Sequence, residues 1–589
     1  MKLKQLFLIF LPGILSAQNF PYQRDWGTYY GGLDSQIGAI YEDQPDHSVL
    51  VDGFTAYPSI GPAPAPEYYN QFITSGGQPF IPSSTQPFSN NFRGRFSASG
   101  ALLHAGYSLF TQYSYRDPSG NRYSIEKDIT NPALPIGVWL SGNVTNQDRI
   151  LSKYDENNNL LWRTYIPGSE SPLLTFDSSG NIYMAGTTSW QNLGDSGTFQ
   201  EDFETVTDPT GFVKPNSYIV KLNPQGQKIW ATYTPSKVIS CLAIYEDNLY
   251  IAGLDDLNTS ASTLATEGAF QATKSNQFIS KINGSTGQRI WGTYYGIPNS
   301  SASLILYLKT TSTGIYMTGT TFSPVNSTYF ATPGAYKAST TDGFDLFLSK
   351  FDDDGKQVWS TYLGTDEYEW IIGSRSFDVK DDKIIVTGIS QGQIASPGAF
   401  LSTKPNPGNT DVFFSMFNTS GNHISTSYYG GPSIYSIGAN SHLSAQFSEY
   451  SDAFYLFGTT DTQTGFASAN AHQQNMIYPS GIAKGQAGFL AKFSSTVLST
   501  TEASTGKDLA LYNNPNNGNF SLRGSDLEKS FYTIHITDMS GRLIYSAPTS
   551  KKPEEHLSLA DKLESGAYIL SVNKTDKTVL KTFKLIIKK

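Results

Sequence analysis

A stretch of the form Trp-x-Thr-Tyr-x-Gly recurs along the chain and constrains its fold more than any other feature. Recognisable copies begin at Trp26, Trp162, Trp230, Trp291 and Trp359, and degenerate copies begin at His104 and at Ser425, which stands in the Trp position. Neighbouring copies lie 58 to 78 residues apart. A regular period of this size predicts a repeat architecture, in which each unit packs against its neighbours.

Three further strand-like segments accompany each Trp-type strand, which we call strand d. Strand a is a mixed apolar segment such as SLILYL, and strand c has the form of SYIVKL or LFLSKF, followed by a tight polar turn such as NPQGQ. Strand b ends on a glycine in each unit: Gly53, Gly142, Gly186, Gly253, Gly319, Gly388 and Gly458. Alternating apolar residues between Gly, Asn and Asp turns indicate antiparallel hairpins. Four strands in each of seven units predict an all-β chain whose main domain, residues 18–498, is a seven-bladed β-propeller.

The two ends of the repeat region are complementary. The chain begins with a lone d strand at residues 26–32, and the last unit ends on its c strand near Phe489. We therefore expect the N-terminal strand to complete the seventh blade and close the ring, which removes the exposed strand edges of an open array. The recurrent Trp and Tyr of strand d are then interpreted as packing between blades, and the recurrent lysines of strand c as structural: Lys153, Lys221, Lys281, Lys350 and Lys492.

The repeats resemble the bacterial seven-bladed propeller repeats of the SBBP kind. GNIYMAGTT from Gly180, TPGAYKAS from Thr332 and LFLSKFDDDGKQVWSTYLG from Leu346 carry this resemblance, which extends over most of residues 26–498. Two units depart from the pattern. The first contains a long Pro- and Tyr-rich insertion, and we expect the second to contain an insertion between its strands a and b.

A second domain follows the repeats. Residues 499–507 form a polar linker of small residues, and residues 508–589 alternate strand-like segments with Asn-Gly and Ser-Gly turns, which predicts a small β-sandwich. LYNNPNNGNF from Leu511, ITDMSGRLIY from Ile536 and LESGAYILSV from Leu563 resemble the C-terminal type A sorting domain of the type IX secretion system of Bacteroidota. The resemblance implies that this domain binds the type IX machinery as a partner, directs export and is then removed.

The N-terminus has the order of a secretory signal peptide, here residues 1–17. Lys2 and Lys4 precede an apolar run from Leu6 to Leu15, and Ser16-Ala17 precedes the expected cleavage site. No later segment is apolar for long enough to cross a membrane, so we expect a protein exported across the inner membrane to the outer-membrane surface or the extracellular space. The net charge of −9 argues against nucleic acid as a partner. Cys241 is the single cysteine and lies in an apolar run, which favours a buried residue over a reactive thiol.

No known catalytic, cofactor or metal motif occurs in the chain, so we expect no catalytic residue, no cofactor and no metal site. Asp352-Asp353-Asp354-Gly355 lacks the spacing of a calcium loop and is interpreted as a hairpin turn. The pattern D-x-x-G-x-x-x-W resembles the tryptophan-docking repeats of quinoprotein dehydrogenases, but the sequence shows no residues for the cofactor site of those enzymes.

Alternating strand directions predict where a ligand would bind. They place the long b–c connections on one face of the propeller, together with the d–a connections. The candidate ligand-binding residues on that face are Trp190, Asp255, Asp256, Tyr329, Asp366, Glu367, Glu369, Trp370 and Tyr435. The segment DEYEW at 366–370 is the densest group, because it places carboxylates beside an indole. The alternative interpretation is a solvated loop with Trp370 packed onto the blade.

Three functions are compatible with these features. The first is a non-enzymatic module that binds a polysaccharide or a surface protein. The second is a polysaccharide hydrolase or lyase that uses loop carboxylates. The third is a passive structural or adhesin-like surface protein. Propellers host many unrelated functions, so the fold does not decide among them.

Overall fold

The computed structural model divides the chain into two compact units, residues 1–494 and residues 495–589. The structure describes residues 20–589 except 44–45, 56–65, 81–89, 109–114, 128–137, 143–148, 157–158, 169–171, 208–209, 256–263, 342–343, 374, 434–441, 480–484, 497–508, 539–541 and 575–578. The expected signal peptide and linker therefore lie outside the described residues. Among the residues described, no helix is both long enough and apolar enough to cross a membrane.

The first unit consists of seven antiparallel sheets, which we number as blades 1 to 7. Blade 1 contains β2 (Ser35–Glu42), β3 (Val49–Thr55), β4 (Asn90–Phe96) and β5 (Leu102–Ser108), with α1 (Pro66–Asn70) between β3 and β4. Blade 2 contains β6 (Tyr115–Arg116), β7 (Arg122–Lys127), β8 (Arg149–Tyr154) and β9 (Leu160–Ile166). Blade 3 contains β10 (Leu173–Phe176), β11 (Ile182–Thr188), β12 (Asn216–Leu222) and β13 (Lys228–Thr234). Blade 4 contains β14 (Val238–Tyr245), β15 (Asn248–Leu254), β16 (Gln277–Asn283) and β17 (Arg289–Tyr294).

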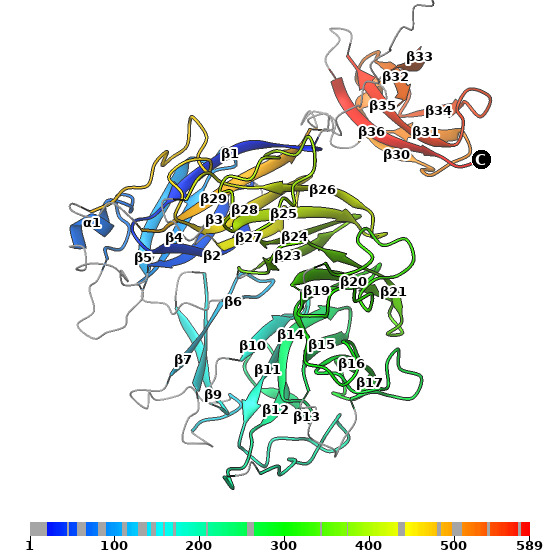
Figure 1. The fold of residues 1–589 in the computed structure, drawn as a ribbon. Coiled ribbons are helices and arrows are strands. Elements are labelled where there is room, and N and C mark those ends of the chain that lie inside the picture. The colour runs from blue at the N-terminus through cyan, green and yellow to red at the C-terminus, as the bar shows by residue number, and fades with distance from the viewer. Residues whose placement is uncertain are drawn as a thin grey trace, which may run out of the picture. The chain divides into compact units, whose positions relative to one another are not determined.

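The remaining blades follow the same order. Blade 5 contains β18 (Ser303–Thr311), β19 (Gly314–Thr321), β20 (Asp345–Phe351) and β21 (Gln357–Leu363). Blade 6 contains β22 (Glu369–Trp370), β23 (Phe377–Lys380), β24 (Lys383–Ser390), β25 (Asp411–Asn418) and β26 (His423–Tyr428). Blade 7 contains β27 (His442–Phe447), β28 (Ala453–Thr460), β29 (Ala487–Ser495) and, from the N-terminus, β1 (Tyr22–Tyr30). Figure 1 shows the first strands of the sheets facing the middle of the ring and the fourth strands at its outside.

The predicted closure of the ring is confirmed. β1 is hydrogen-bonded to β29, in the sheet order β1-β29-β28-β27, so the first strand of the chain is the fourth strand of the last blade. The join continues into blade 1, because Trp26 lies 6.4 Å from Phe96, ring centre to ring centre, with the rings stacked. No blade of the ring therefore depends on a second molecule to complete its sheet.

A close approach between strands explains the glycine of strand b. In six of the seven blades this glycine pairs with an aromatic residue of strand c, as Gly319 does with Phe347 and Gly388 with Phe413. A Cβ atom on Gly319 would lie 2.8 Å from the Phe347 ring and would also collide with the backbone of strand a. The backbone of strand a, together with the ring of strand c, thus occupies the space that a side chain at Gly319 would need.

The prediction for the second repeat, which is blade 2, was wrong. Gly142 does not end a strand: residues 138–142 are bends, and strand b of blade 2 is β7. The insertion therefore lies between strands b and c, not between a and b. The backbone amide of Tyr165 on β9 donates to Leu140 O at 3.1 Å, so residues 138–142 lie along the outside of strand d.

The long b–c connections follow this course in every blade. In blade 5, Thr332 N donates to Ser360 O at 3.0 Å and Tyr362 N donates to Lys337 O at 3.1 Å, so the connection runs beside β21. Equivalent pairs link Tyr107 with Gln78, Tyr233 with Gln200, Tyr294 with Gln271, Tyr428 with Leu401 and Tyr29 with Gln473. The connections leave from one face, as expected, but much of their length covers the outer edge of strand d, which protects that edge from pairing with other chains.

Where strand d carries a Trp, this residue joins its blade to the next. Trp230 donates through Nε1 to Gly284 O at 2.9 Å, and its ring packs on Gly287 in the c–d turn of blade 4. The same bond links Trp26 to Ala98, Trp162 to Pro224, Trp291 to Asp353 and Trp359 to Thr419. The strand c lysines lie 4.8 to 5.7 Å from the ring centres of strand b tyrosines. The Trp and Lys positions are therefore structural, as predicted.

Two further predictions about single residues agree with the structure. Asp352 Oδ1 accepts the backbone amides of Asp354 at 3.1 Å and Lys356 at 2.8 Å, which is the geometry of an Asx turn in a hairpin. Cys241 is buried, and this burial raises the pKa of its thiol to about 12. At neutral pH the thiol is protonated and acts as a small apolar residue.

The second unit is a β-sandwich. One sheet has the order β30 (Ala510–Tyr512), β31 (Asn519–Arg523) and β34 (Glu554–Ser558). The other has the order β33 (Leu543–Pro548), β32 (Thr533–Asp538), β35 (Gly566–Asn573) and β36 (Val579–Ile587), and α2 spans Asp526–Lys529. Phe520 and Leu557 of the first sheet share one core with Ile536, Leu570 and Leu585 of the second.

Candidate functional site

The connection from β21 to β22 carries four of the predicted site residues. Asp366 and Glu367 are exposed, Trp370 is half-buried and Glu369 is fully buried. The motif glycine Gly364 begins this connection, and a Cβ atom there would collide with Asp345 and with Glu369. The glycine therefore allows two carboxylates to approach the backbone at the base of the DEYEW segment.

Trp370 belongs to a group of four aromatic side chains, which we call the aromatic group: Phe322, Phe344, Tyr368 and Trp370. The Trp370 ring lies 5.3 Å from Phe322 and 6.3 Å from Tyr368, centre to centre, and its plane is within 6° of that of Tyr368. Phe344 lies 5.6 Å from Phe322 and 5.5 Å from Tyr368, and 40% of it is exposed. Phe322 follows strand b of blade 5 and Phe344 precedes strand c, so the group lies where the b–c and d–a connections of this blade begin or end.

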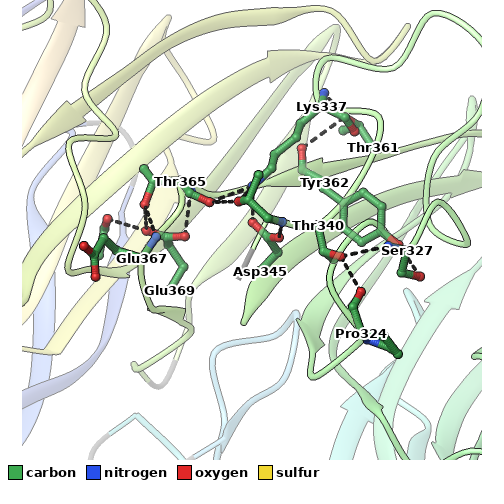
Figure 2. Close-up of polar contacts among 12 residues, drawn as sticks. Pro324, Ser327, Lys337, Thr340, Asp345, Thr361, Tyr362, Thr365, Glu367 and Glu369 are labelled. Atoms are coloured by element: carbon green, nitrogen blue, oxygen red, sulfur yellow. Dashed lines mark hydrogen bonds and ion pairs between the residues drawn. The ribbon is translucent and has the colours of Figure 1, made fainter. Parts of the chain in front are cut away.

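The buried Glu369 side chain holds the DEYEW segment in place through hydrogen bonds (Figure 2). Its Oε1 accepts hydrogen bonds from Thr365 Oγ1 at 2.7 Å and Ser390 Oγ at 2.6 Å, and its Oε2 accepts Thr365 N at 2.7 Å. Burial raises the pKa of Glu369 to about 7, although these three donors act in the opposite direction. The carboxyl is thus committed to holding residues 365–369 in one conformation.

Lys337 and Asp345 continue the same network. Lys337 Nζ lies 2.5 Å from Asp345 Oδ1 and donates to Thr365 O at 2.9 Å (Figure 2). A pair at the same place in blade 6, Lys404 and Asp411, lies 2.9 Å apart. Because the ion pair recurs in a neighbouring blade, we assign it to the support of the connections rather than to chemistry.

The other predicted residues do not join this site. Asp255 is buried and accepts Tyr294 OH at 2.9 Å, with Lys274 Nζ at 3.5 Å. Tyr329 donates to Gln271 and accepts Gly296 N at 3.0 Å, and Trp190 packs against Trp139 with the ring centres 6.4 Å apart. These three residues therefore hold their connections to neighbouring strands and connections and do not reach the DEYEW segment. Asp256 and Tyr435 lie outside the described residues.

Sequence reasoning missed three members of the aromatic group: Phe322, Phe344 and Tyr368. A signal for two of them exists, since Phe322 directly follows the end of strand b and Phe344 directly precedes strand c. Residues at these positions must meet where the connection leaves and re-enters the blade. Within the described part of the chain, no group of three or more His, Cys, Asp or Glu could hold a metal ion.

Comparison with known proteins bears mainly on the second unit. Residues 510–588 match the family model described as a secretion system C-terminal sorting domain. The chain therefore ends in a type IX sorting domain, which implies interaction with that machinery and secretion to the cell surface or the extracellular space. No curated protein matches the chain.

Several solved structures resemble the chain only weakly. The Dos1 propeller is 8% identical, with a TM-score of 0.32, over 81% of this chain and 95% of that one. The phage phi92 endosialidase is 10% identical, with a TM-score of 0.31, over 81% and 70%. The Pan2 WD40 domain of Neurospora crassa is 7% identical, with a TM-score of 0.28, over 61% and 88%. The propeller assignment rests on the seven antiparallel sheets of the chain itself and on the closure of the ring by β1.

Proposed function

We propose that this protein, which ends in a type IX sorting domain, displays a propeller outside the cell that binds a glycan without catalysis at the aromatic group. Residues 1–17 serve as the signal peptide for the inner membrane in this proposal. The residues from about 508 onward direct the second export step and are then removed, which leaves the propeller at the surface or in the medium.

The aromatic group beside exposed carboxylates is the observation that carries this proposal. Aromatic faces provide apolar contact for the C–H faces of a sugar ring, and the Asp366 and Glu367 carboxylates can accept hydrogen bonds from sugar hydroxyls. The Glu369 network fixes the backbone between these two kinds of group. A site fixed before binding loses less conformational entropy when the ligand arrives.

The hydrolase alternative is less well supported by the same residues. A glycosidase needs two carboxyl groups that both reach the scissile bond. Glu369 is the carboxyl with the raised pKa that a general acid requires, but it is fully buried and bonded to Thr365 and Ser390. Asp345 is buried and paired with Lys337. The exposed pair, Asp366 and Glu367, are neighbours in sequence and have no opposing partner in the DEYEW segment.

A polysaccharide panel tests the proposal, with the purified secreted protein and its Trp370→Ala variant. Losing a central aromatic anchor typically costs about 2 kcal/mol, so we expect roughly thirtyfold weaker binding for the variant. Tyr336→Ala is the matched control, because Tyr336 is 48% exposed and stacks on His423 outside the aromatic group. Its affinity should equal that of the wild type.

The possible outcomes separate the three functions. Binding without release of reducing ends supports the proposal, and release of reducing ends supports the hydrolase. Absence of both supports a passive surface protein. If Trp370→Ala binds like the wild type, or lowers the melting temperature markedly, then Trp370 is blade packing and the site lies elsewhere.

A further inference from the structure

Strand a of blade 6 is divided into two pieces. β22 and β23 both pair with β24, but they are separate strands: β22 ends at Trp370 and β23 begins at Phe377, next to Ser376, whose carbonyl accepts Thr387 N of β24 at 2.8 Å. In blades 1, 3, 4, 5 and 7 the described strand a is a single strand. An interruption of this kind bends the chain and re-aims the side chains within it.

The interruption carries Arg375 onto blade 7. Arg375 N donates to Ser444 Oγ at 3.1 Å, and Arg375 O accepts Ala445 N at 2.8 Å. Ser376 Oγ, next in sequence, donates to Leu443 O at 3.3 Å. The backbone of Arg375 is therefore fixed against β27, the first strand of the neighbouring blade.

The Arg375 side chain then meets groups from two other blades. Its Nη1 donates to Gln446 Oε1 of blade 7 at 3.1 Å, and its guanidinium carbon lies 5.4 Å from the centre of the Tyr41 ring of blade 1. The guanidinium of Arg116, from blade 2, lies 5.7 Å from the same ring. Arg375, between β22 and β23, and Arg116, on β6, thus bring two guanidinium groups to one tyrosine of β2, and the first strands β2, β6 and β23 face the middle of the ring in Figure 1.

Positive charge exceeds negative charge at this place. Asp43 lies 3.2 Å from Arg116 and 2.7 Å from Arg95, so one carboxylate serves two arginines. Among the described residues, no carboxylate lies within ion-pair distance of Arg375. Lys309, a cation on the first strand of blade 5, differs in this respect, since it lies 3.0 Å from Asp378.

The Arg375 guanidinium retains donors for a ligand. A guanidinium has five N–H donors in a planar fork, and among the described residues Arg375 donates from its side chain only through Nη1, to Gln446. Arg375, Arg116 and Tyr41 are all half-buried rather than sealed, so solvent reaches them. A planar fork of this kind binds carboxylate or sulfate oxygens in pairs, and the fixed backbone reduces the entropic cost.

We propose that the middle of the ring binds an oxyanion, a carboxylate or sulfate group of an acidic ligand, with Arg375 as the principal contact and Arg116 as the second. The proposal is independent of the glycan site at the aromatic group. Its ligand differs in charge, and none of its residues, Arg375, Arg116 and Tyr41, belongs to the aromatic group.

Calorimetric titration of the full chain tests the proposal with three probes of matched size: an oligogalacturonate, a sulfated oligogalactan and a neutral oligogalactan. We expect at least one acidic probe to bind and Arg375→Gln to weaken that binding at least tenfold. Arg375→Lys keeps the charge without the fork and should give an intermediate affinity. The ratio of the two acidic probes distinguishes carboxylate from sulfate as the preferred group.

Arg24→Gln is the matched control. Arg24 also lies over an aromatic ring, 5.5 Å from the centre of Phe400, but it belongs to a fourth strand and donates to Gly465 O and Phe466 O. Its removal should leave the affinity unchanged. The proposal is overturned if no acidic probe binds the wild type, if Arg375→Gln binds as the wild type does, or if Arg24→Gln weakens binding equally. Melting curves show whether Arg375→Gln loses binding because it unfolds. If it does, the test rests on Arg375→Lys, and an affinity equal to that of the wild type overturns the proposal.

Discussion

The glycine of the c–d turn offers a direct test of how tryptophan joins the blades. Gly287 has φ +73°, and a Cβ atom there would lie 2.9 Å from Cε3 of Trp230. Gly268, in the same blade, has φ +71°, but a Cβ atom there would meet nothing within 4 Å. Alanine at either position incurs the same backbone strain, and only alanine at 287 also collides with the tryptophan.

The expected magnitudes follow from these two contributions. An alanine held at positive φ costs about 1 kcal/mol, and this term applies to both variants. Overpacking a well-filled contact typically costs a further 1–3 kcal/mol, roughly, and applies to Gly287→Ala alone. Trp230 cannot avoid the collision easily, because it is buried and its Nε1 donates to Gly284 O.

Urea unfolding of both variants measures the difference. We expect Gly287→Ala to lose about 1–3 kcal/mol more free energy of unfolding than Gly268→Ala. In a Trp230→Phe background the smaller ring leaves room, and the difference between the two glycine variants should shrink. Equal losses in the wild-type background would refute the idea that Trp230 presses on the turn.

Three other predictions address ring closure, processing and pH. Deleting residues 18–33 removes β1, exposes β29 and should lower the melting temperature or cause aggregation; a truncated protein that melts like the intact propeller contradicts the closure as a stabilising feature. The protein recovered from the cell surface or the medium should have an intact mass that ends near residues 498–508, and a mature form that retains Lys589 argues against removal of the sorting domain. Because burial raises the pKa of Glu369 from 4.5 to about 7, the folded protein holds this proton where the unfolded chain has released it. The shifted pKa of Glu369 therefore stabilises the folded protein fully below pH 4.5. This stabilisation, at most roughly 3 kcal/mol, is lost as the pH rises to about 7. Glu369→Gln should flatten the melting temperature over this interval relative to the wild type, and parallel profiles for the two proteins would contradict the assignment.

Much of the fold could be predicted because each repeat signal corresponds to a contact within one blade or with the next. The glycine of strand b is required by the backbone of strand a and the aromatic ring of strand c, as at Gly319, Leu304 and Phe347. The tryptophan of strand d is required by a carbonyl in the following turn, as at Trp230 and Gly284. Such short-range requirements appear in the sequence at fixed intervals, so counting them predicts the number of blades.

Blade 2 shows where counting fails. The alternating apolar segment ending at Gly142 imitates strand b, whereas the true strand, β7, is polar and ends without a glycine. A better signal was present in the turn before it. Asp117-Pro-Ser-Gly-Asn121 has the same form as Asp177-Ser-Ser-Gly-Asn181, and in both turns the Asp amide donates to the Asn carbonyl before strand b begins.

The candidate site was predicted only in part, because its geometry depends on contacts between distant segments. DEYEW identified Trp370 and its acidic neighbours, but the course of the connections along strand d is set by backbone bonds such as that between Tyr362 and Lys337. These bonds use main-chain atoms and leave little trace in side-chain identity. Asp255 and Tyr329 were therefore assigned to a binding face, although Asp255 accepts Tyr294 of strand d in its own blade, and Tyr329 bonds to Gln271 of blade 4 and to Gly296, which follows that blade.

Some departures from the repeat follow from the closure of the ring by the N-terminal strand, and others do not. Ser425 replaces the tryptophan in blade 6, and the closure accounts for it: blade 7 takes β1 from the N-terminus and so has no c–d turn on which a tryptophan could dock. Phe20 instead packs on Phe414 of blade 6, with ring centres 5.7 Å apart. The interruption between β22 and β23 lies where strand a of blades 1, 4 and 5 has a one-residue register shift, but it is longer than these shifts, and closure of the ring does not require the extra length. A departure that closure does not require, and that fixes an arginine without a carboxylate among the described residues, is better explained by a ligand than by the architecture.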